Sequence, residues 1–228
     1  HSLWRNPTGY MKLDATGKTL DLGLDIPRLS EKIANVQQAS GEIPWCSGKK
    51  TDPWDHIEAA MGLSIGGWLE KAQAAYAWLA AHQNPDGSWY SAYRQGNVLD
   101  RTRDANMSSY IAVGVWQHYL ISGDTGFLQR LWPNIDAAID FALSLQSLHG
   151  DINWAISPGG RVDRMAILTG SSSIFMSIKC GLANGRHLGY NRPNWKEGLR
   201  KLEHAILYKP HRFNMTKSRY SMDWYYPV

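Results

Sequence analysis

Apolar side chains recur at helical spacing through most of the chain. In residues 67–83 the apolar positions that share one face of a helix are Leu69, Ala72, Tyr76, Leu79 and Ala80. In residues 126–146 the corresponding positions are Leu128, Leu131, Ile135, Ile139 and Leu143. A period near 3.6 residues predicts two amphipathic helices that each bury one face. Pro133 is expected to kink the second helix or to start a fresh one.

Two other segments have a different pattern. Residues 104–123 and 164–185 are apolar nearly all round, and the second is rich in small residues. A helix of this kind is buried on every side, so both segments predict inner helices. The tight joints SIGGW and ISGDTGF suit antiparallel helical hairpins. The predicted fold is all-α, an α/α toroid in which about four helical hairpins form an inner and an outer ring. Strands are expected only as small hairpins in the loops, around INW and SWY.

A turn motif repeats between the predicted helices. Its three copies are QQASGEIPW (37–45), QNPDGSW (83–89) and QSLHGDINW (146–154). Each copy has a Gln leaving a helix, then a Gly beside an acidic residue, then a Trp. A loop follows, and then an acidic residue that opens a new apolar segment, namely Asp52, Asp104 or Asp163. Because every long loop then leads from an outer to an inner helix, we expect the loops to gather at one end and their acids and aromatics to face a common hollow.

The number of predicted hairpins bears on the domain organisation. A closed ring needs more hairpins than these, and the chain ends on the aromatic stretch DWYYPV. The segment SRYSMDWYYPV is a candidate opening of a further hairpin. We therefore expect residues 1–228 to form a single toroid domain with an incomplete ring, truncated at its C-terminus.

The aromatic composition indicates the kind of ligand. The chain has 11 Trp and 11 Tyr against 4 Phe. Trp and Tyr combine an apolar body with a polar edge. Their excess predicts large, half-wet pockets whose rings stack on sugars or enclose a prenyl chain. Dense helix packing is the alternative interpretation for any single ring.

Charge and cysteine usage exclude several classes of function. The net charge of +4 is scattered, which argues against nucleic-acid binding. No apolar run reaches the ~20 residues that a membrane span needs. Cys46 and Cys180 lie far apart, which predicts free thiols and a cytoplasmic location, with a single disulfide as the alternative. The two Cys and eight His show no grouping typical of a metal site, and no organic cofactor is expected. The oligomeric state is not predicted.

The turn motif and one helical segment resemble known toroids. QNPDGSW matches the QxxDGxW repeat of squalene and oxidosqualene cyclases and of prenyltransferase-type toroids. The segment RDANMSSYIAVGVWQHYLISGDTGFLQRLWPNIDAAIDFALSLQ is similar to six-hairpin glycoside hydrolases of the glucoamylase type, in which RDA opens an inner helix. The chain also resembles bacterial proteins described as prenyltransferase-like or squalene-cyclase-like, among them the mycobacterial hydrolases of methylated mannose polysaccharides. The resemblance covers roughly residues 51–154 and implies the α/α toroid.

Two departures narrow what the resemblance implies. The DxDD-type acid with which terpene cyclases of this fold protonate an alkene is missing from the sequence. The Asp, Cys and His set of the zinc-dependent protein prenyltransferases is not recognisable either. The glycosidase reading is therefore favoured over the cyclase and prenyltransferase readings.

Glycoside hydrolysis needs two carboxylates that flank the scissile bond. The stretch TDPWDHIEAAMG provides Asp52 before Pro53, and Asp55 one turn further on. The alternative is purely structural, because Asp before Pro is a helix N-cap and a first-turn acid is favoured by the helix dipole. Asp104 in TRDAN is the other catalytic candidate and has the same alternative. Arg103 beside it is expected to hold a carboxylate ionised or to grip a substrate oxygen.

The remaining candidates are substrate-binding residues. Trp54 and His56 are placed to stack on a sugar and to donate to a hydroxyl, with core packing as the alternative. Asp223 with Trp224 is a candidate sugar-binding pair near the chain's end. Asp86 and Asp151, within the turns, are expected to brace the loops. The full set of candidate binding residues is Trp45, Trp54, His56, Trp89, Tyr90, Arg103, Asp223 and Trp224.

The sequence thus predicts a glycoside hydrolase that acts on a poly- or oligosaccharide by a two-carboxylate, inverting mechanism. Asp52 or Asp55 is one catalytic carboxylate, and its partner is Asp104, Asp223 or a residue beyond Val228. Two alternatives stay open, a terpene or prenyl cyclase-like enzyme and a non-catalytic carbohydrate-binding toroid. The expected partner is the carbohydrate alone.

Overall fold

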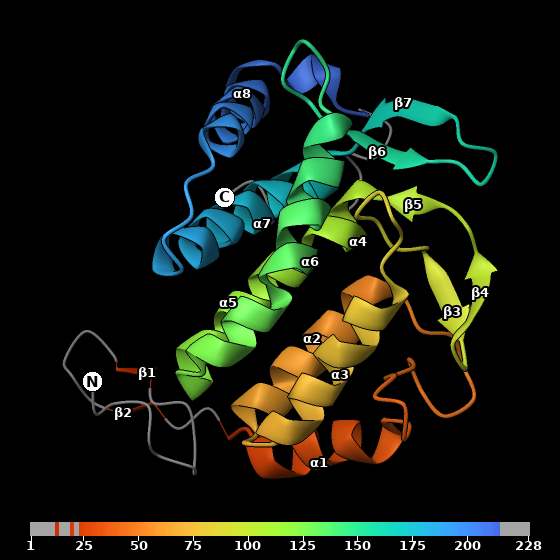
Figure 1. The fold of residues 1–228 in the computed structure, drawn as a ribbon, viewed down its shortest axis with the longest axis vertical. Helices are drawn as coiled ribbons and strands as arrows, with labels where there is room; N and C mark the ends of the chain where they lie inside the picture. Colours follow the sequence, from red (N-terminus) through yellow and green to blue (C-terminus); the bar gives the residue numbers. More distant parts are fainter. Residues whose placement is uncertain (1–11, 14–18, 21–22, 215–228) are drawn as a thin grey trace.

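The computed structural model describes residues 12–13, 19–20 and 23–214. Its helices are α1 (Ile26–Val36), α2 (Pro53–Ile65), α3 (Leu69–His82), α4 (Ala105–Ser109), α5 (Ile111–Ser122), α6 (Thr125–Ser144), α7 (Leu168–His187) and α8 (Pro193–Tyr208), followed by a 3₁₀ turn at Pro210–Arg212. Helix α1 is followed by the hairpins α2–α3, α4/α5–α6 and α7–α8 (Figure 1). The predicted all-α toroid is confirmed, with three hairpins in the described part where the sequence predicted about four. Asp223 and Trp224, in the expected further opening, lie outside the described residues.

The helices form two layers, as their patterning predicts. The inner helices α2, α5 and α7 pack side by side, while α3, α6 and α8 pack in order behind them. One hydrophobic core runs between the layers from Ala34 to Leu202. Among the described helices, none combines the length and apolarity that crossing a bilayer requires. Pro133 lies inside the continuous helix α6, so the expected fresh start there was wrong.

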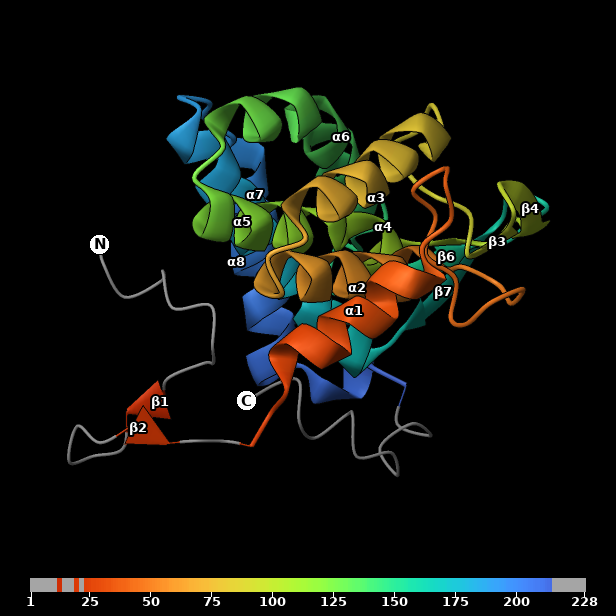
Figure 2. The same ribbon diagram turned by 90° about the horizontal axis from the view of Figure 1, so that it is seen from below.

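The short strands lie outside the helices, most of them in the long loops. They are β1 (Lys12–Leu13), β2 (Thr19–Leu20), β3 (Ala92–Arg94), β4 (Asn97–Asp100), β5 (Arg103–Asp104), β6 (Asn153–Ile156) and β7 (Val162–Ala166). β1 pairs with β2, β3 with β4, and β5–β6–β7 form a small sheet, all antiparallel. Figures 1 and 2 both show β3, β4, β6 and β7 at one side of the helices. The prediction around INW is met by β6, whereas SWY is not a strand.

The Gln of each turn motif ties its loop to the next outer helix. Gln83 Nε2 donates to the carbonyl oxygens of Gly87 and Asn134, each at 2.9 Å. The same two bonds join Gln37 to Gly41 and Lys71, and Gln146 to Gly150 and Gly198. The predicted sequence repeat is therefore a repeat of three-dimensional structure.

The Gly of each motif permits this close approach. Gly87 has φ +88°, and a Cβ there would overlap the carbonyl oxygen of Ala137 on α6. The corresponding overlaps for Gly41 and Gly150 are with Ala74 and Lys201. Any other residue would meet both backbone strain and a clash with the neighbouring helix.

The acids that follow the motifs are only partly as predicted. Asp52 caps α2, with Pro53 at the first helical position, and Asp104 caps α4. Asp163 does not open a helix, because it lies in β7. Helix α7 begins five residues later, at Leu168, and its N-cap Ile167 makes no side-chain cap. The β6–β7 hairpin, which local spacing does not reveal, displaces the start of the third inner helix.

Candidate active site at the loop end

The long loops are joined to one another at one end of the molecule. Thr51, before α2, exchanges two backbone hydrogen bonds with Tyr93 in the second loop, at 2.8 and 2.7 Å. In the small sheet, Arg103 pairs with Ile156 and Asp104 with Ala155 of the third loop. The expectation that the three loops gather at one end is confirmed, and the N-termini of α2 and α4 open among them.

Asp52 is buried and holds its neighbours in place. Only 3% of its surface is exposed. Its Oδ2 accepts from Trp45 Nε1 at 2.6 Å, and its Oδ1 accepts from the backbone N–H of Asp55 at 2.9 Å. Trp45 itself is 57% exposed, with Lys50 Nζ 4.0 Å from the ring centroid. Asp52 therefore caps the helix and fixes an exposed indole at the same time.

Asp55 combines exposure with a perturbed acidity. Desolvation of its carboxyl group, followed by the negative charge of Asp52, raises its pKa to about 6. A hydrogen bond between the two side chains adds to this rise, and the charge of Glu58 contributes further. Two carboxyl groups in direct contact lie too close to admit the water that an inverting enzyme places across ~6.5–9.5 Å. Asp52 and Asp55 thus form one functional unit rather than an acid and its opposing base.

Asp104 is half-buried at the start of α4. Its Oδ1 accepts from the backbone N–H groups of Asn106, at 2.7 Å, and Met107, at 3.0 Å. Burial nevertheless raises its pKa to about 6, because the desolvation outweighs these bonds, and the charge of Asp52 adds to the rise. The charge of Asp52 therefore contributes to the raised pKa of both Asp55 and Asp104, and both carboxyl groups hold protons more tightly than usual.

The expected common hollow is divided in two. Asp104 lines a cavity of about 290 Å³ with Trp54, Trp154 and residues of α7. Asp55 lines a second hollow of about 420 Å³ between α1 and α2, together with Trp45. The expectation that the acids share one cavity was wrong in this respect, because Asp104 lines one hollow with Trp54 and Asp55 lines the other with Trp45.

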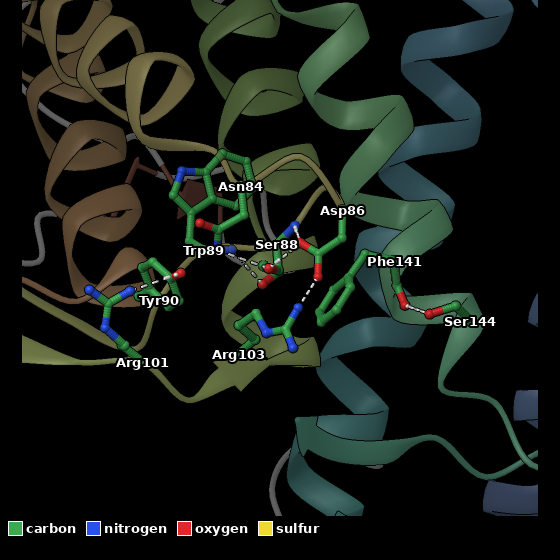
Figure 3. Close-up of polar contacts among 10 residues, drawn as sticks. Asn84, Asp86, Ser88, Trp89, Tyr90, Arg101, Arg103, Phe141 and Ser144 are labelled. Carbon is green, nitrogen blue, oxygen red and sulfur yellow. Dashed lines mark hydrogen bonds and ion pairs between the residues drawn. The ribbon is translucent and has the colours of Figure 1, made fainter. Parts of the chain in front are cut away.

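Arg103 braces a turn instead of serving Asp104. Its guanidinium pairs with Asp86, whose Oδ1 also accepts from the Ser88 backbone N–H and hydroxyl, at 3.1 and 2.6 Å (Figure 3). This confirms the bracing role predicted for Asp86. Tyr90 lies beside this turn, and its hydroxyl accepts from Arg101 at 3.3 Å (Figure 3).

Two of the predicted binding residues belong to the core. His56 is fully buried, its Nδ1 accepts from the Ile43 N–H at 3.1 Å and its Nε2 donates to the Ala75 carbonyl at 2.9 Å. Burial lowers its pKa to about 4, so the ring is neutral and both nitrogens are used by the backbone. Trp89 is 1% exposed and donates to the Leu79 carbonyl at 2.8 Å. Neither side chain lines the Asp104 hollow or the Asp55 hollow, and both are packed in the core, which is the alternative that the sequence left open.

The register of the turn motif explains the error at Trp89. Trp45 and Trp154 follow the motif Gly by four residues, whereas Trp89 follows it by two. Ile43 and Ile152 occupy the corresponding core positions in the other copies. Aligning the three copies on their Gly would have separated the core ring from the two loop rings.

Sequence reasoning missed several residues around the Asp104 cavity. Trp54 stacks on Tyr110 with ring centroids 3.7 Å apart and planes at 13°, which fixes the indole at the cavity wall. Asn106, Trp154 and Ser171 line the same cavity. Asn106 follows Asp104 by two residues, and Trp154 shares its motif position with Trp45. Both could therefore have been identified as candidates from the sequence. Within the described residues, no group of three or more His, Cys, Asp or Glu is arranged to hold a metal ion.

Known proteins resemble the chain both in sequence and in fold. No protein-family model matches the chain. It is 46% identical over 199 residues to the MMP endo-(1,4)-3-O-methyl-α-D-mannosidase of Mycolicibacterium hassiacum, covering 87% of this chain and 55% of that protein. The chain thus spans about half the length of the curated relative that it matches.

Solved structures match the fold. A possible member of the GH105 family from Salmonella enterica superposes with a TM-score of 0.66 at 11% identity, over 82% of this chain and 54% of that one. A possible GH105 member from Klebsiella pneumoniae gives a TM-score of 0.64 at 12% identity, over 80% and 51%. At such identities the match concerns architecture alone. The chain is an α/α toroid, and in sequence it is similar to a mycobacterial methylmannose polysaccharide hydrolase, as its turn motifs indicate.

Proposed function

We propose that this protein is a glycoside hydrolase that cleaves an α-(1,4)-linked, 3-O-methylated mannose polysaccharide. The observation that carries the proposal is the loop end itself, where Asp55 and Asp104 both have a pKa of about 6 and each lines a hollow with a Trp. Perturbed carboxyl groups in clefts are typical of acid–base catalysts. The substrate class is supported by the relative, whose name describes that linkage and methyl ether.

Asp55 acts as the general acid that protonates the leaving oxygen. A proton donor must still hold its proton near neutral pH, which an ordinary Asp does not. Desolvation is the largest cause of the raised pKa of Asp55, and Asp52 adds to it through its negative charge and its hydrogen bond. Because Asp52 is buried under Trp45 and Asp55, we assign it a positioning role and not a contact with substrate.

Asp104 acts as the general base that activates water. It comes from a different helix and lines a different hollow from Asp55, so the two carboxyl groups are not in direct contact. A separate acid and base with room for water between them is the arrangement of an inverting glycosidase. Asp223 is the alternative base and lies outside the described residues. A sugar chain running over the first turn of α2 would contact Trp45 on one side and Trp54 on the other.

The experiment measures cleavage of a purified α-(1,4)-linked 3-O-methylmannose oligosaccharide. We expect Asp55→Asn to lower kcat by about 10²- to 10⁴-fold, the usual contribution of general acid catalysis, with little change in binding. NMR of the first product formed should show the β anomer, as inversion requires.

Asp52→Asn separates positioning from catalysis. Without the Asp52 charge the pKa of Asp55 falls, so the alkaline limb of the pH–rate profile should move to lower pH. The matched control is Asp124→Asn, an N-cap of α6 whose carboxylate accepts from Phe127 N–H at 2.9 Å. Full activity in Asp55→Asn would refute Asp55 as the general acid. Binding without any turnover by the unaltered protein would refute the hydrolase assignment.

A further inference from the structure

Three buried polar atoms beside the Asp104 cavity have no hydrogen-bond partner among the described residues. They are Asn106 Oδ1, Trp154 Nε1 and Ser171 Oγ. All three residues line the cavity of about 290 Å³, and Ser171 is only 1% exposed. Nearly all buried polar groups in folded proteins are paired, so unpaired atoms gathered at one cavity call for an explanation. A ligand that supplies the missing partners provides one.

The three atoms differ in what they offer a ligand. Asn106 Oδ1 accepts a hydrogen bond, Trp154 Nε1 donates one, and the Ser171 hydroxyl does either. They come from α4, β6 and α7, so the third loop and two inner helices all contribute. A sugar ring, whose hydroxyls both donate and accept and whose ether oxygens only accept, matches such a mixed set.

Much of the remaining wall is apolar, and its other polar residues are Asp104, Thr169 and Ser173. Ile152, Ile167 and Ile174 line the same cavity, and Trp54 is held there by its stack on Tyr110. A fully hydroxylated sugar would leave polar groups facing these aliphatic side chains, which costs free energy. A methyl ether places a CH₃ group against them instead.

We propose that this cavity is a specificity subsite for one methyl-ether-bearing sugar unit, whose hydroxyl and ring oxygens pair with Asn106, Trp154 and Ser171 while its methyl group packs on Ile152, Ile167 and Ile174. This proposal rests on the proposed function and names the part of the substrate that the cavity selects. The volume lies at the lower end of the ~300–1,000 Å³ range of ligand pockets, which suits one sugar ring and not a longer stretch of chain.

The test measures binding of two oligosaccharides to the full-length protein carrying Asp55→Asn, so that neither is cleaved. One probe is an α-(1,4)-linked 3-O-methylmannose oligosaccharide, and the other is its unmethylated counterpart. Calorimetry gives both dissociation constants. Ser171→Ala and Trp154→Phe each remove one hydrogen-bonding group. Ser171→Ala keeps the shape of the wall, whereas Trp154→Phe also makes an aromatic side chain smaller, as its control does. We expect each to weaken binding of both probes by about 3- to 10-fold, the usual value of one hydrogen bond.

The chain offers a matched control for each substitution. Ser177 lies on the same helix α7, is also fully buried, and its hydroxyl also has no partner among the described residues, but it does not line the cavity. Trp78 likewise has a buried, unpaired Nε1 away from this cavity. We expect Ser177→Ala and Trp78→Phe to leave both dissociation constants unchanged.

A third substitution tests the apolar wall. Ile167 is the N-cap of α7 and lacks a capping side chain, so Ile167→Thr adds a suitable cap while making the wall more polar. We expect the preference for the methylated over the unmethylated probe to fall by about threefold. An unchanged preference would overturn the role of the methyl group.

The outcomes distinguish the two proposals. If the unaltered protein cleaves the methylated oligosaccharide but Ser171→Ala and Trp154→Phe bind as their controls do, the subsite is refuted and the hydrolase stands. Equal losses in the controls would show a structural effect and would also refute the subsite. If the unaltered protein neither binds nor cleaves either probe, the proposed function fails, and the subsite fails with it.

Discussion

Asp residues cap helices at both ends of the helical hairpins, but their pKa values are shifted in opposite directions. Asp104 at the loop end and Asp124 at the short-joint end are both helix N-caps that accept from backbone N–H groups. Burial raises the pKa of Asp104 to about 6. The pKa of Asp124 is instead lowered, first by the Phe127 N–H and then by Arg130 and Gln73. A cap alone therefore does not make a catalytic candidate, and the surrounding loops decide which carboxyl group becomes one.

The glycines at the two ends show the same contrast. Gly87 and Gly123 both have positive φ, at +88° and +69°. A Cβ at Gly87 would overlap the Ala137 carbonyl, whereas a Cβ at Gly123 would meet nothing within 4 Å. The short joint thus needs only a left-handed turn, while the loop end also needs close contact with the next helix. Close packing against the next helix is therefore a feature of the loop end that the short joint lacks.

The largest expected effect is on catalysis. Asp104→Asn keeps the cap, because Asn is as good an N-cap as Asp, but it removes the proposed base. We expect kcat on the methylated mannose oligosaccharide to fall by about 10²- to 10⁴-fold. Asp124→Asn should leave kcat within about twofold, since that carboxylate lies at the other end. Similar rates for the two variants would show that the contrast between the caps has no catalytic meaning.

The next effect in size is on stability. Gly87→Ala should lower the free energy of unfolding by about 3 kcal/mol or more, because left-handed strain and the clash with Ala137 add together. Gly123→Ala has only the strain and should cost about 1 kcal/mol. Urea denaturation of both variants gives the comparison. Equal losses would mean that α6 moves aside easily, and that the loop end is not as tightly packed as proposed.

The Gln residues give a smaller contrast. Gln83 Nε2 makes two bonds to carbonyls, and its Oε1 accepts from Asn134 Nδ2 at 2.6 Å. Gln83→Ala should therefore cost about 2 kcal/mol of unfolding free energy. Gln73, at the short-joint end, makes one bond of 3.3 Å to Asp124, and Gln73→Ala should cost at most about 0.5 kcal/mol. A loss at Gln83 no greater than that at Gln73 would make the repeated Gln incidental.

Much of the fold could be predicted because its signals are local. Helical periodicity gave the inner and outer helices, and Asp followed by Pro marked the start of α2. The β5–β6 pairing could not be predicted, since Asp104 is at once a strand residue and a helix cap, and its partner Ala155 lies in another loop. The same kind of long-range insertion moved the start of α7 beyond Asp163.

The site was less predictable, for a related reason. Asp55 and Asp104 could be chosen from their residue type and from their positions at helix starts, but no local pattern shows that they line two different hollows. His56 was a candidate binding residue because it follows Asp55 in the sequence. Its two ring nitrogens are hydrogen-bonded to the backbone of Ile43 and Ala75, which come from elsewhere in the chain. Ser171 lies in a segment whose small residues predicted only a buried inner helix, and the cavity that it lines with Trp154 of β6 is visible only in the structure.

The smallest expected effect is on the pH dependence of stability, and it has opposite signs for the two capping residues, Asp104 and Asp124. The pKa of Asp104 is about 6 in the folded state and about 4 when unfolded, so between these values the folded protein binds more protons. The contribution of Asp104 to stability therefore falls as pH rises from about 4 to 6 and stays reduced above that. Asp124 has the opposite shift, so its contribution is present at neutral pH and is lost in acid.

Asp104→Asn should thus raise the free energy of unfolding at pH 8 but not at pH 4. A two-unit shift corresponds to about 3 kcal/mol, and partial exposure together with the lost charge at the helix start reduces the expected gain to about 1 kcal/mol. Asp124 is more than a third exposed, so Asp124→Asn should lose only a few tenths of a kcal/mol at pH 8. Urea titrations at the two pH values measure both changes. A loss of stability in Asp104→Asn at pH 8 would show that the carboxylate is held there for folding, whereas a gain alongside lost turnover is what a catalytic group kept at a cost to stability requires.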